Sequence, residues 1–129
     1  MSQDDRPIVL VVDDDEPGRE LVRRKLEKAY RVITAANGAE ALECVASDEV
    51  DLVVLDVMMP GMDGYTACRR IKESSGDGFL PVILLTALQG QDDINRGLAA
   101  GADEFLTKPI DTRELRLRAS ALLRIRSQE

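Results

Sequence analysis

Histidine and tryptophan are absent from this 129-residue chain. Without histidine, the chain by itself cannot form a Ser-His-Asp triad, a histidine metal site or a phosphohistidine. Only two Tyr and two Phe are present, so a hydrophobic core has to consist mainly of aliphatic side chains. No run of about 18 apolar residues occurs, which argues against a membrane-spanning helix.

Cysteine is scarce as well. Cys44 and Cys68 both fall inside helical patterns, and neither has a partner spaced for a zinc site. The polar, acidic residues 1–5 do not look like a secretory signal. We therefore expect two reduced thiols that pack as small hydrophobic side chains, in a cytoplasmic protein.

Acidic residues outnumber basic ones, which gives a net charge of −7. An acidic chain is a poor non-specific partner for nucleic acid or anionic membranes, so neither is expected. Residues 111–129 are the exception, with five Arg against three acidic residues. This basic end is compatible with an interface and equally with an ordinary solvated helix face.

Two kinds of hydrophobic pattern alternate along the chain. Apolar or β-branched runs predict strands at residues 7–13, 31–35, 51–56, 81–86 and 103–107. Helical spacing predicts helices at residues 17–29, 39–47, 63–74, 91–100 and from 111 or 112 onward. Such alternation predicts an α/β fold, a parallel sheet with helices on both faces. The length suits a single domain, 1–129, with a core at about 7–125.

Individual residues mark several helix ends. Pro17 suits a first helical turn, Asp63 is a candidate N-terminal cap, and Gly101 is a candidate terminator. In the helix at 17–29, the apolar residues at helical spacing are Leu21, Val22, Leu26 and Ala29. These positions are expected on its inner face.

Polar residues stand at the carboxyl ends of the predicted strands: Asp13, Asp14, Asp56, Thr86 and Lys108. In open α/β sheets, sites form at these ends, where the strand order reverses. For the order 2-1-3-4-5 that point lies between the first and third strands. Their acids would crowd together, and protonation, a lysine or a hard cation would have to compensate. Mg²⁺, which prefers oxygen ligands, fits such a place.

This set of groups suits phosphoryl transfer to a carboxylate. Asp56 would be the nucleophile, while Thr86 and Lys108 would stabilise the phosphoryl oxygens. Taken singly, each residue also has an ordinary explanation. Asp56 could end a strand or cap a helix, Thr86 could be a β-branched strand residue, and Lys108 could be a solvated turn residue. Because these residues occur together at four strand ends, a shared role in phosphoryl transfer is favoured over separate structural roles.

Four motifs extend this interpretation to a family: VLVVDDD (9–15), LVVLDVMMPGMDG (52–64), ILLTA (83–87) and AGADEFLTKP (100–109). With them, residues 7 to about 125 closely resemble the receiver domain of two-component response regulators. The resemblance implies the CheY-like fold, a doubly wound five-stranded parallel sheet of order 2-1-3-4-5 with five helices.

The resemblance also implies roles around the acids. Asp56 would accept the phosphoryl group and take part in binding Mg²⁺, for which Mn²⁺ could substitute. Asp14 would bind the ion directly, Asp13 mainly through water, and Met58 through its backbone carbonyl.

Further positions would respond to phosphorylation. Thr86 and Lys108 would contact the phosphoryl oxygens, and Phe105 matches the aromatic residue that turns inward on activation, although it could equally be a plain core residue. The Lys108-Pro109 peptide bond would be cis, as is usual in the family.

Two positions tune the phosphoryl lifetime in the family, and they correspond to Met58 and Leu88 here. Both are apolar and cannot orient a water molecule, so we expect slow self-dephosphorylation, with a half-life of minutes or longer. Asp15 stands where many members have Glu, and this extra acid could alter metal affinity.

The implied partners follow from the missing histidine. A histidine kinase, a histidine phosphotransfer protein or a small acyl phosphate would be the donor. The surface of the helix at 91–100, the strand at 103–107 and the last helix would then signal to an output domain or protein, or form a homodimer. The chain would catalyse only its own phosphorylation and dephosphorylation. Residues 122–126 could continue into an output module, and we favour a truncated regulator over a stand-alone one.

Two alternatives belong to other functional classes. A phosphohydrolase of the haloacid-dehalogenase type also has an Asp-x-Asp motif, here Asp13 and Asp15, and would use Asp13 as nucleophile. A receiver-like module that only makes contacts would need no phosphorylation. The missing cap domain argues against the first, and the complete set of site residues argues against the second.

Overall fold

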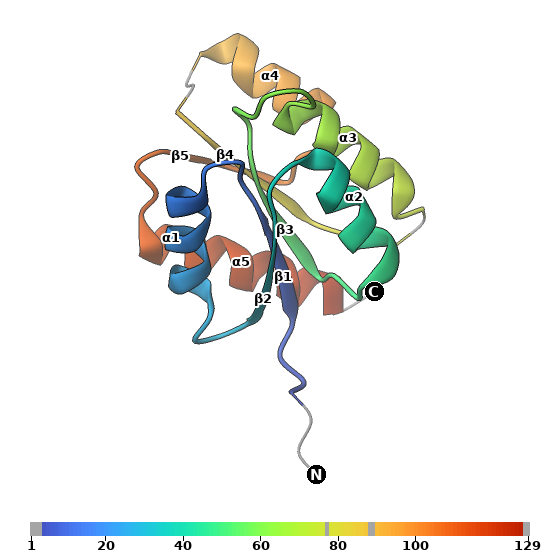
Figure 1. Cartoon of the computed structure of the whole chain (residues 1–129), viewed down its shortest axis with the longest axis vertical. Coiled ribbons are helices and arrows are strands. Elements are labelled where there is room, and N and C mark those ends of the chain that lie inside the picture. Colours follow the sequence, from blue (N-terminus) through green and yellow to red (C-terminus); the bar gives the residue numbers. More distant parts are fainter. Residues whose placement is uncertain (1–3, 77, 88–89, 128–129) are drawn as a thin grey trace.

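The strands form one parallel sheet in the order β2-β1-β3-β4-β5, as the resemblance implied. A computed structural model describes residues 4–76, 78–87 and 90–127 (Figure 1). The strands are β1 (Ile8–Val12), β2 (Arg31–Ala35), β3 (Leu52–Asp56), β4 (Val82–Thr86) and β5 (Glu104–Thr107). The helices are α1 (Glu16–Leu26), α2 (Gly38–Ser47), α3 (Gly64–Ser74), α4 (Gln91–Ala99) and α5 (Thr112–Ser127).

Alternate strand residues enter two separate aliphatic cores. In β1, Val9 and Val11 pack in the core that α1 and α5 cover, together with Leu115. Leu10 and Val12 belong to the opposite core, which contains buried residues of α2 and α3. Figure 1 shows these two helix layers on opposite faces of the sheet. Because both faces are covered, the central strands β3 and β4 are buried throughout, which explains their unbroken apolar runs.

Helix α1 is shorter than predicted. It ends at Leu26, whose carbonyl accepts the backbone N–H groups of Ala29 and Tyr30 in a closing turn. The expected inward position of Leu21 is wrong, since this residue is 57% exposed. The buried stripe of α1 runs through Val22 and Leu26, four residues apart, and Leu21 lies one position outside it.

The residues predicted to mark helix ends do so. Pro17 lies in the first turn of α1, and the Asp63 side chain caps α3 by accepting the Thr66 N–H at 2.9 Å. Asp111, rather than Thr112, caps α5, because its Oδ1 accepts the Glu114 N–H at 3.0 Å. Gly101 follows α4 with a φ of +92°, a conformation that glycine adopts without strain.

Both cysteines are free, Cys68 buried and Cys44 partly buried, as expected. Burial raises the pKa of the Cys68 thiol to about 11, so it behaves as an inert hydrophobic group. No helix in the described ranges is both long enough and apolar enough to cross a bilayer.

Candidate functional site

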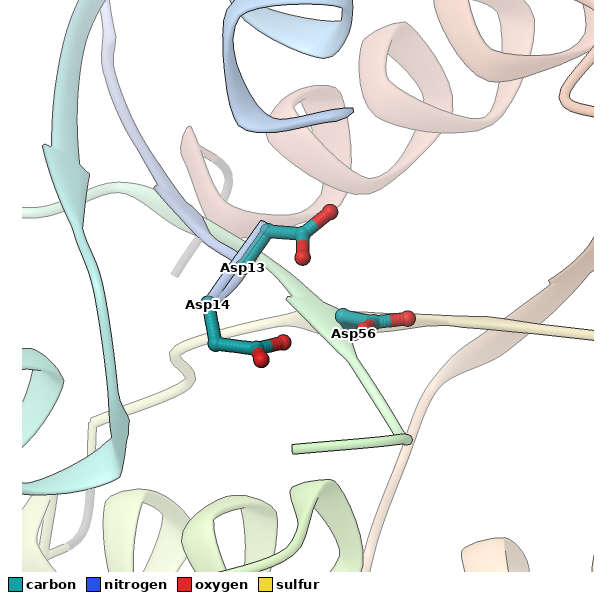
Figure 2. A group of neighbouring side chains, drawn as sticks. All are labelled: Asp13, Asp14 and Asp56. Atoms are coloured by element: carbon teal, nitrogen blue, oxygen red, sulfur yellow. The ribbon is translucent and has the colours of Figure 1, made fainter. Parts of the chain in front are cut away.

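Three carboxylates gather where β1 and β3 end. These strands are neighbours in register, with Val12 opposite Leu55, so the residues that follow must meet at one edge of the sheet. Carboxylate oxygens of Asp13, Asp14 and Asp56 all lie within 4.8 Å of one another. Figure 2 shows the three side chains extending into a common space. The sequence prediction that these acids converge is confirmed.

The cluster is electrostatically strained. Asp13 and Asp56 are 4% and 3% exposed, whereas Asp14 is exposed. Burial raises the pKa of the Asp13 carboxyl, and the charges of Asp56 and Asp14 raise it further. The Asp15 N–H, 3.0 Å from Asp13 Oδ1, and the Lys108 charge act in the opposite direction. A close group of three carboxylates, two of them buried, favours a bound cation.

Lys108 supplies positive charge on the other side of Asp56. Its Nζ lies 2.7 Å from Asp56 Oδ1, close enough for an ion pair. Asp56 Oδ1 is buried, and among the described residues it has no hydrogen bond besides this ion-pair contact. The oxygen is thus shielded from water and faces the Lys108 ammonium.

Thr86 and Lys108 are joined through the backbone. Thr86 ends β4, beside β3, and its carbonyl accepts the Lys108 N–H at 2.8 Å. Thr86 itself is buried. The Lys108-Pro109 peptide bond is cis, as the resemblance implied. The structure therefore brings both predicted residues to the edge of the sheet that carries the acids.

The loop after Asp56 is packed tightly against α3. Gly64 donates its N–H to the Val57 carbonyl at 2.9 Å. A Cβ at Gly64 would lie only 2.5 Å from the Asp56 carbonyl oxygen, so glycine is required for this close approach. The Met58 side chain, one of the two predicted lifetime positions, is 61% exposed. The other, Leu88, lies outside the described residues.

Phe105 packs against the backbone of α4. A Cβ at Gly97 would lie 1.8 Å from the Phe105 Cζ, so the ring occupies the space that any larger residue at position 97 would need. Sequence reasoning missed a second contact of this helix. The Arg96 guanidinium lies 4.4 Å from the centroid of the Tyr65 ring and 3.8 Å from Asp63, which connects α4 to α3.

Sequence reasoning also missed Arg19. Its Nη1 donates to the backbone carbonyl of Asp13 at 2.8 Å. The signal available was a basic residue six positions after Asp13, in the first turns of a helix that begins at the acidic loop. The extra acid Asp15 has a local use, because its Oδ2 accepts the Gly18 N–H at 3.0 Å and caps α1.

The model of the response regulator receiver domain family matches residues 9–120. The chain belongs to this family. Receiver domains are phosphoacceptor switches of two-component systems rather than conventional enzymes. Because the chain belongs to the receiver family, the haloacid-dehalogenase alternative is excluded.

Curated relatives are response regulators. PleD from Caulobacter vibrioides is 47% identical over 119 residues, which cover 92% of this chain and 26% of PleD. MprA from Mycolicibacterium vanbaalenii is 48% identical over 117 residues, which cover 90% of this chain and 50% of MprA. The chain thus spans between a quarter and a half of the length of these relatives.

Solved receiver structures share the fold. The chemotaxis protein CheY4 of Vibrio cholerae superposes with a TM-score of 0.85 at 32% identity, covering 91% of this chain and 98% of that one. The receiver domain of an HD domain-containing protein from Pseudomonas fluorescens gives a TM-score of 0.88 at 31% identity, covering 96% and 99%.

Proposed function

We propose that this receiver works as a phosphorylation-dependent switch in which Asp56 accepts a phosphoryl group from a phosphohistidine donor. One observation carries the proposal. The buried Asp56 carboxylate lies within the acidic group and 2.7 Å from Lys108, with one oxygen that no described residue hydrogen-bonds. A carboxylate nucleophile for phosphoryl transfer is favoured by a site shielded from water and by nearby positive charge.

The donor set fits Mg²⁺, and Mn²⁺ as a substitute. Hard cations of this kind prefer carboxylate and carbonyl oxygens and water, and the acidic group offers one buried oxygen without a hydrogen-bond partner. Asp14, Asp56 and the Met58 carbonyl would hold the ion, with Asp13 acting mainly through water. When bound, it would neutralise charge on the phosphoryl oxygens.

The transfer step uses residues of this chain at the acceptor side. A lone pair of the Asp56 carboxylate forms the new O–P bond, the P–N bond of the donor breaks, and its electron pair stays on the donor imidazole. The Lys108 ammonium and the Thr86 hydroxyl then face the phosphoryl oxygens and stabilise their charge. The donor would be a cytoplasmic histidine kinase or a histidine phosphotransfer protein, and small acyl phosphates would substitute.

The signal would be transmitted through the surface formed by α4, β5 and α5. Movement of Thr86 towards the new phosphoryl group and a change at Phe105 would shift α4, which rests on that ring through Gly97. This surface would contact an output domain, a partner protein or a second copy of the chain. Because Met58 and Leu88 are apolar and cannot orient a water molecule, the phosphoryl group would persist for minutes or longer. The chain would act only on its own acyl phosphate.

The test is incubation with acetyl phosphate and Mg²⁺, followed by intact mass spectrometry. Wild type should gain one phosphoryl group, Asp56→Asn and an EDTA-treated sample should gain none, and Asp92→Asn, an exposed α4 residue, should match wild type. If wild type gains no mass and also fails to bind beryllofluoride, the receiver-like contact module replaces this proposal. We also propose that residues 7–125 form the functional unit, so a 7–125 fragment should be phosphorylated like the whole chain.

A further inference from the structure

The first turns of α1 reach back to the acidic loop through Arg19. Its guanidinium donates from Nη1 to the Asp13 carbonyl at 2.8 Å, in a partly buried setting. Arg19 is thus linked to the backbone of the loop that carries Asp13 and Asp14. A planar guanidinium with several donors is suited to hold a carbonyl in one orientation.

The other groups of Asp13 are held as well. Its N–H donates to the Ala35 carbonyl at 3.2 Å, which continues the pairing of β1 with β2. Its Oδ1 accepts the Asp15 N–H at 3.0 Å. With Arg19 on the carbonyl, the peptide unit that joins Asp13 to Asp14 has a single orientation, and this sets the direction in which the Asp14 side chain leaves the backbone.

Gly18 provides the space that this arrangement requires. A Cβ at position 18 would lie 2.9 Å from Asp13 Oδ2 and 2.9 Å from Asp15 Oδ2. Asp15 is exposed and would have to shift within its cap. Asp13 is buried and held at its other oxygen, so its carboxylate would be displaced. Gly18 and Arg19 therefore both act on Asp13. Gly18 leaves space for its carboxylate, and Arg19 holds its backbone carbonyl.

We propose that Arg19 is a positioning residue for the divalent-cation site, and that Gly18 keeps the space its acidic loop occupies. This inference rests on the metal site of the proposed function. A positive charge near a cation site on its own would weaken metal binding, whereas a positioning hydrogen bond strengthens it. The sign of the effect of removing Arg19 therefore separates the two roles.

The experiment measures the Mg²⁺ dissociation constant by isothermal titration calorimetry, on the whole chain. Arg19→Ala should bind Mg²⁺ about 10-fold more weakly, the lower end of the usual effect of losing an outer-shell partner. Arg19→Lys keeps the charge and one donor and should recover part of the affinity. Arg24→Ala removes the same charge from an exposed position of α1 and should bind as wild type does.

The Gly18→Ala variant gives an independent test of the inference. The higher helix propensity of alanine offsets the displacement of the Asp15 cap, so the thermal unfolding midpoint in EDTA should change little, while Mg²⁺ binding should weaken several-fold. A loss of metal affinity without a loss of stability is an outcome that a merely structural role would not produce. This arm remains informative if Arg19→Ala fails to fold.

Two results overturn the inference while leaving the proposed function intact. They are an Arg19→Ala variant that binds Mg²⁺ as tightly as wild type or more tightly, and a Gly18→Ala variant with unchanged affinity, each beside a wild type that gains a phosphoryl group. If wild type itself binds no Mg²⁺ and gains no mass from acetyl phosphate, the proposed function fails, and the inference fails with it.

Discussion

At the scale of single residues, the two buried acids of the site have different environments. Asp56 has the Lys108 ammonium 2.7 Å from one oxygen. The Asp13 carboxylate accepts one backbone N–H, from Asp15, and lies beside two other carboxylates. Burial and these neighbours raise the pKa of Asp13. The metal-free site therefore opposes folding, as expected of a site built to receive a cation.

This predicts a pH dependence of stability. The folded state keeps a proton on Asp13 at pH values where the unfolded chain, with an ordinary aspartate pKa of about 3.9, has released it. The unfolding free energy contributed by this group therefore falls as the pH rises from that value through the raised pKa of Asp13. In EDTA, Asp13→Asn should become progressively more stable than wild type over this range.

Urea unfolding at a series of pH values tests this, with Asp92→Asn as the exposed control. A stability difference between Asp13→Asn and wild type that stays constant with pH would show that the Asp13 carboxyl titrates normally in the folded protein.

At the scale of elements, α4 stands apart from the other helices. Its one buried residue is Gly97, so the helix contributes no buried side chain and rests on the Phe105 ring. Arg96 adds a contact to Tyr65 on α3. A helix held by so few contacts is suited to change position when the residues beneath it change, which is what a switch surface requires.

The fit between Gly97 and Phe105 predicts non-additive mutations. Gly97→Ala places a methyl group where the ring lies and should lower the unfolding free energy by about 1–3 kcal/mol. In a Phe105→Ala background the space is open, so the same change should have little effect or stabilise the helix. Urea unfolding of the four proteins of this double-mutant cycle measures the coupling, and additive effects would mean that residue 97 can gain a side chain without displacing the ring.

At the scale of the whole molecule, the sheet and its helices were predictable because strands buried on both faces must be apolar throughout. The acidic edge was predictable because parallel strands end together. The contacts of Arg19, Arg96 and Phe105 were not, since each joins residues whose relation depends on helix placement rather than on spacing along the chain. The exposure of Leu21 was not predictable for the same reason. Whether Leu21 or its neighbour Val22 faces the core depends on how the helix is rotated about its axis.

A distant contact of the same kind holds the end of α5. Arg126 donates from Nε to Asp51 Oδ1 at 3.2 Å and from Nη1 to the Phe79 carbonyl, while Asp51 Oδ2 accepts the Ile8 N–H at 2.9 Å. The last turn of the helix is thus attached to the edge of the sheet opposite the acidic site.

Arg126→Ala should therefore lower the unfolding free energy by about 1–2 kcal/mol, since it breaks charge-assisted hydrogen bonds and removes the cation beside Asp51. Arg124→Ala, an exposed neighbour on the same helix, should change it by less than about 0.5 kcal/mol. Thermal or urea unfolding measures both, and equal effects would show that the Arg126 contacts add no stability.

The central claim is that Asp56 is the residue that carries the phosphoryl group. Borohydride reduces an aspartyl phosphate to homoserine, so treatment after incubation with acetyl phosphate and Mg²⁺ marks the acceptor permanently. Fragmentation of the tryptic peptides 1–19 and 32–69 by mass spectrometry then locates it. The account predicts homoserine at position 56, and none there when Mg²⁺ is withheld. Homoserine at position 13 or 14, with Asp56 intact, would contradict it.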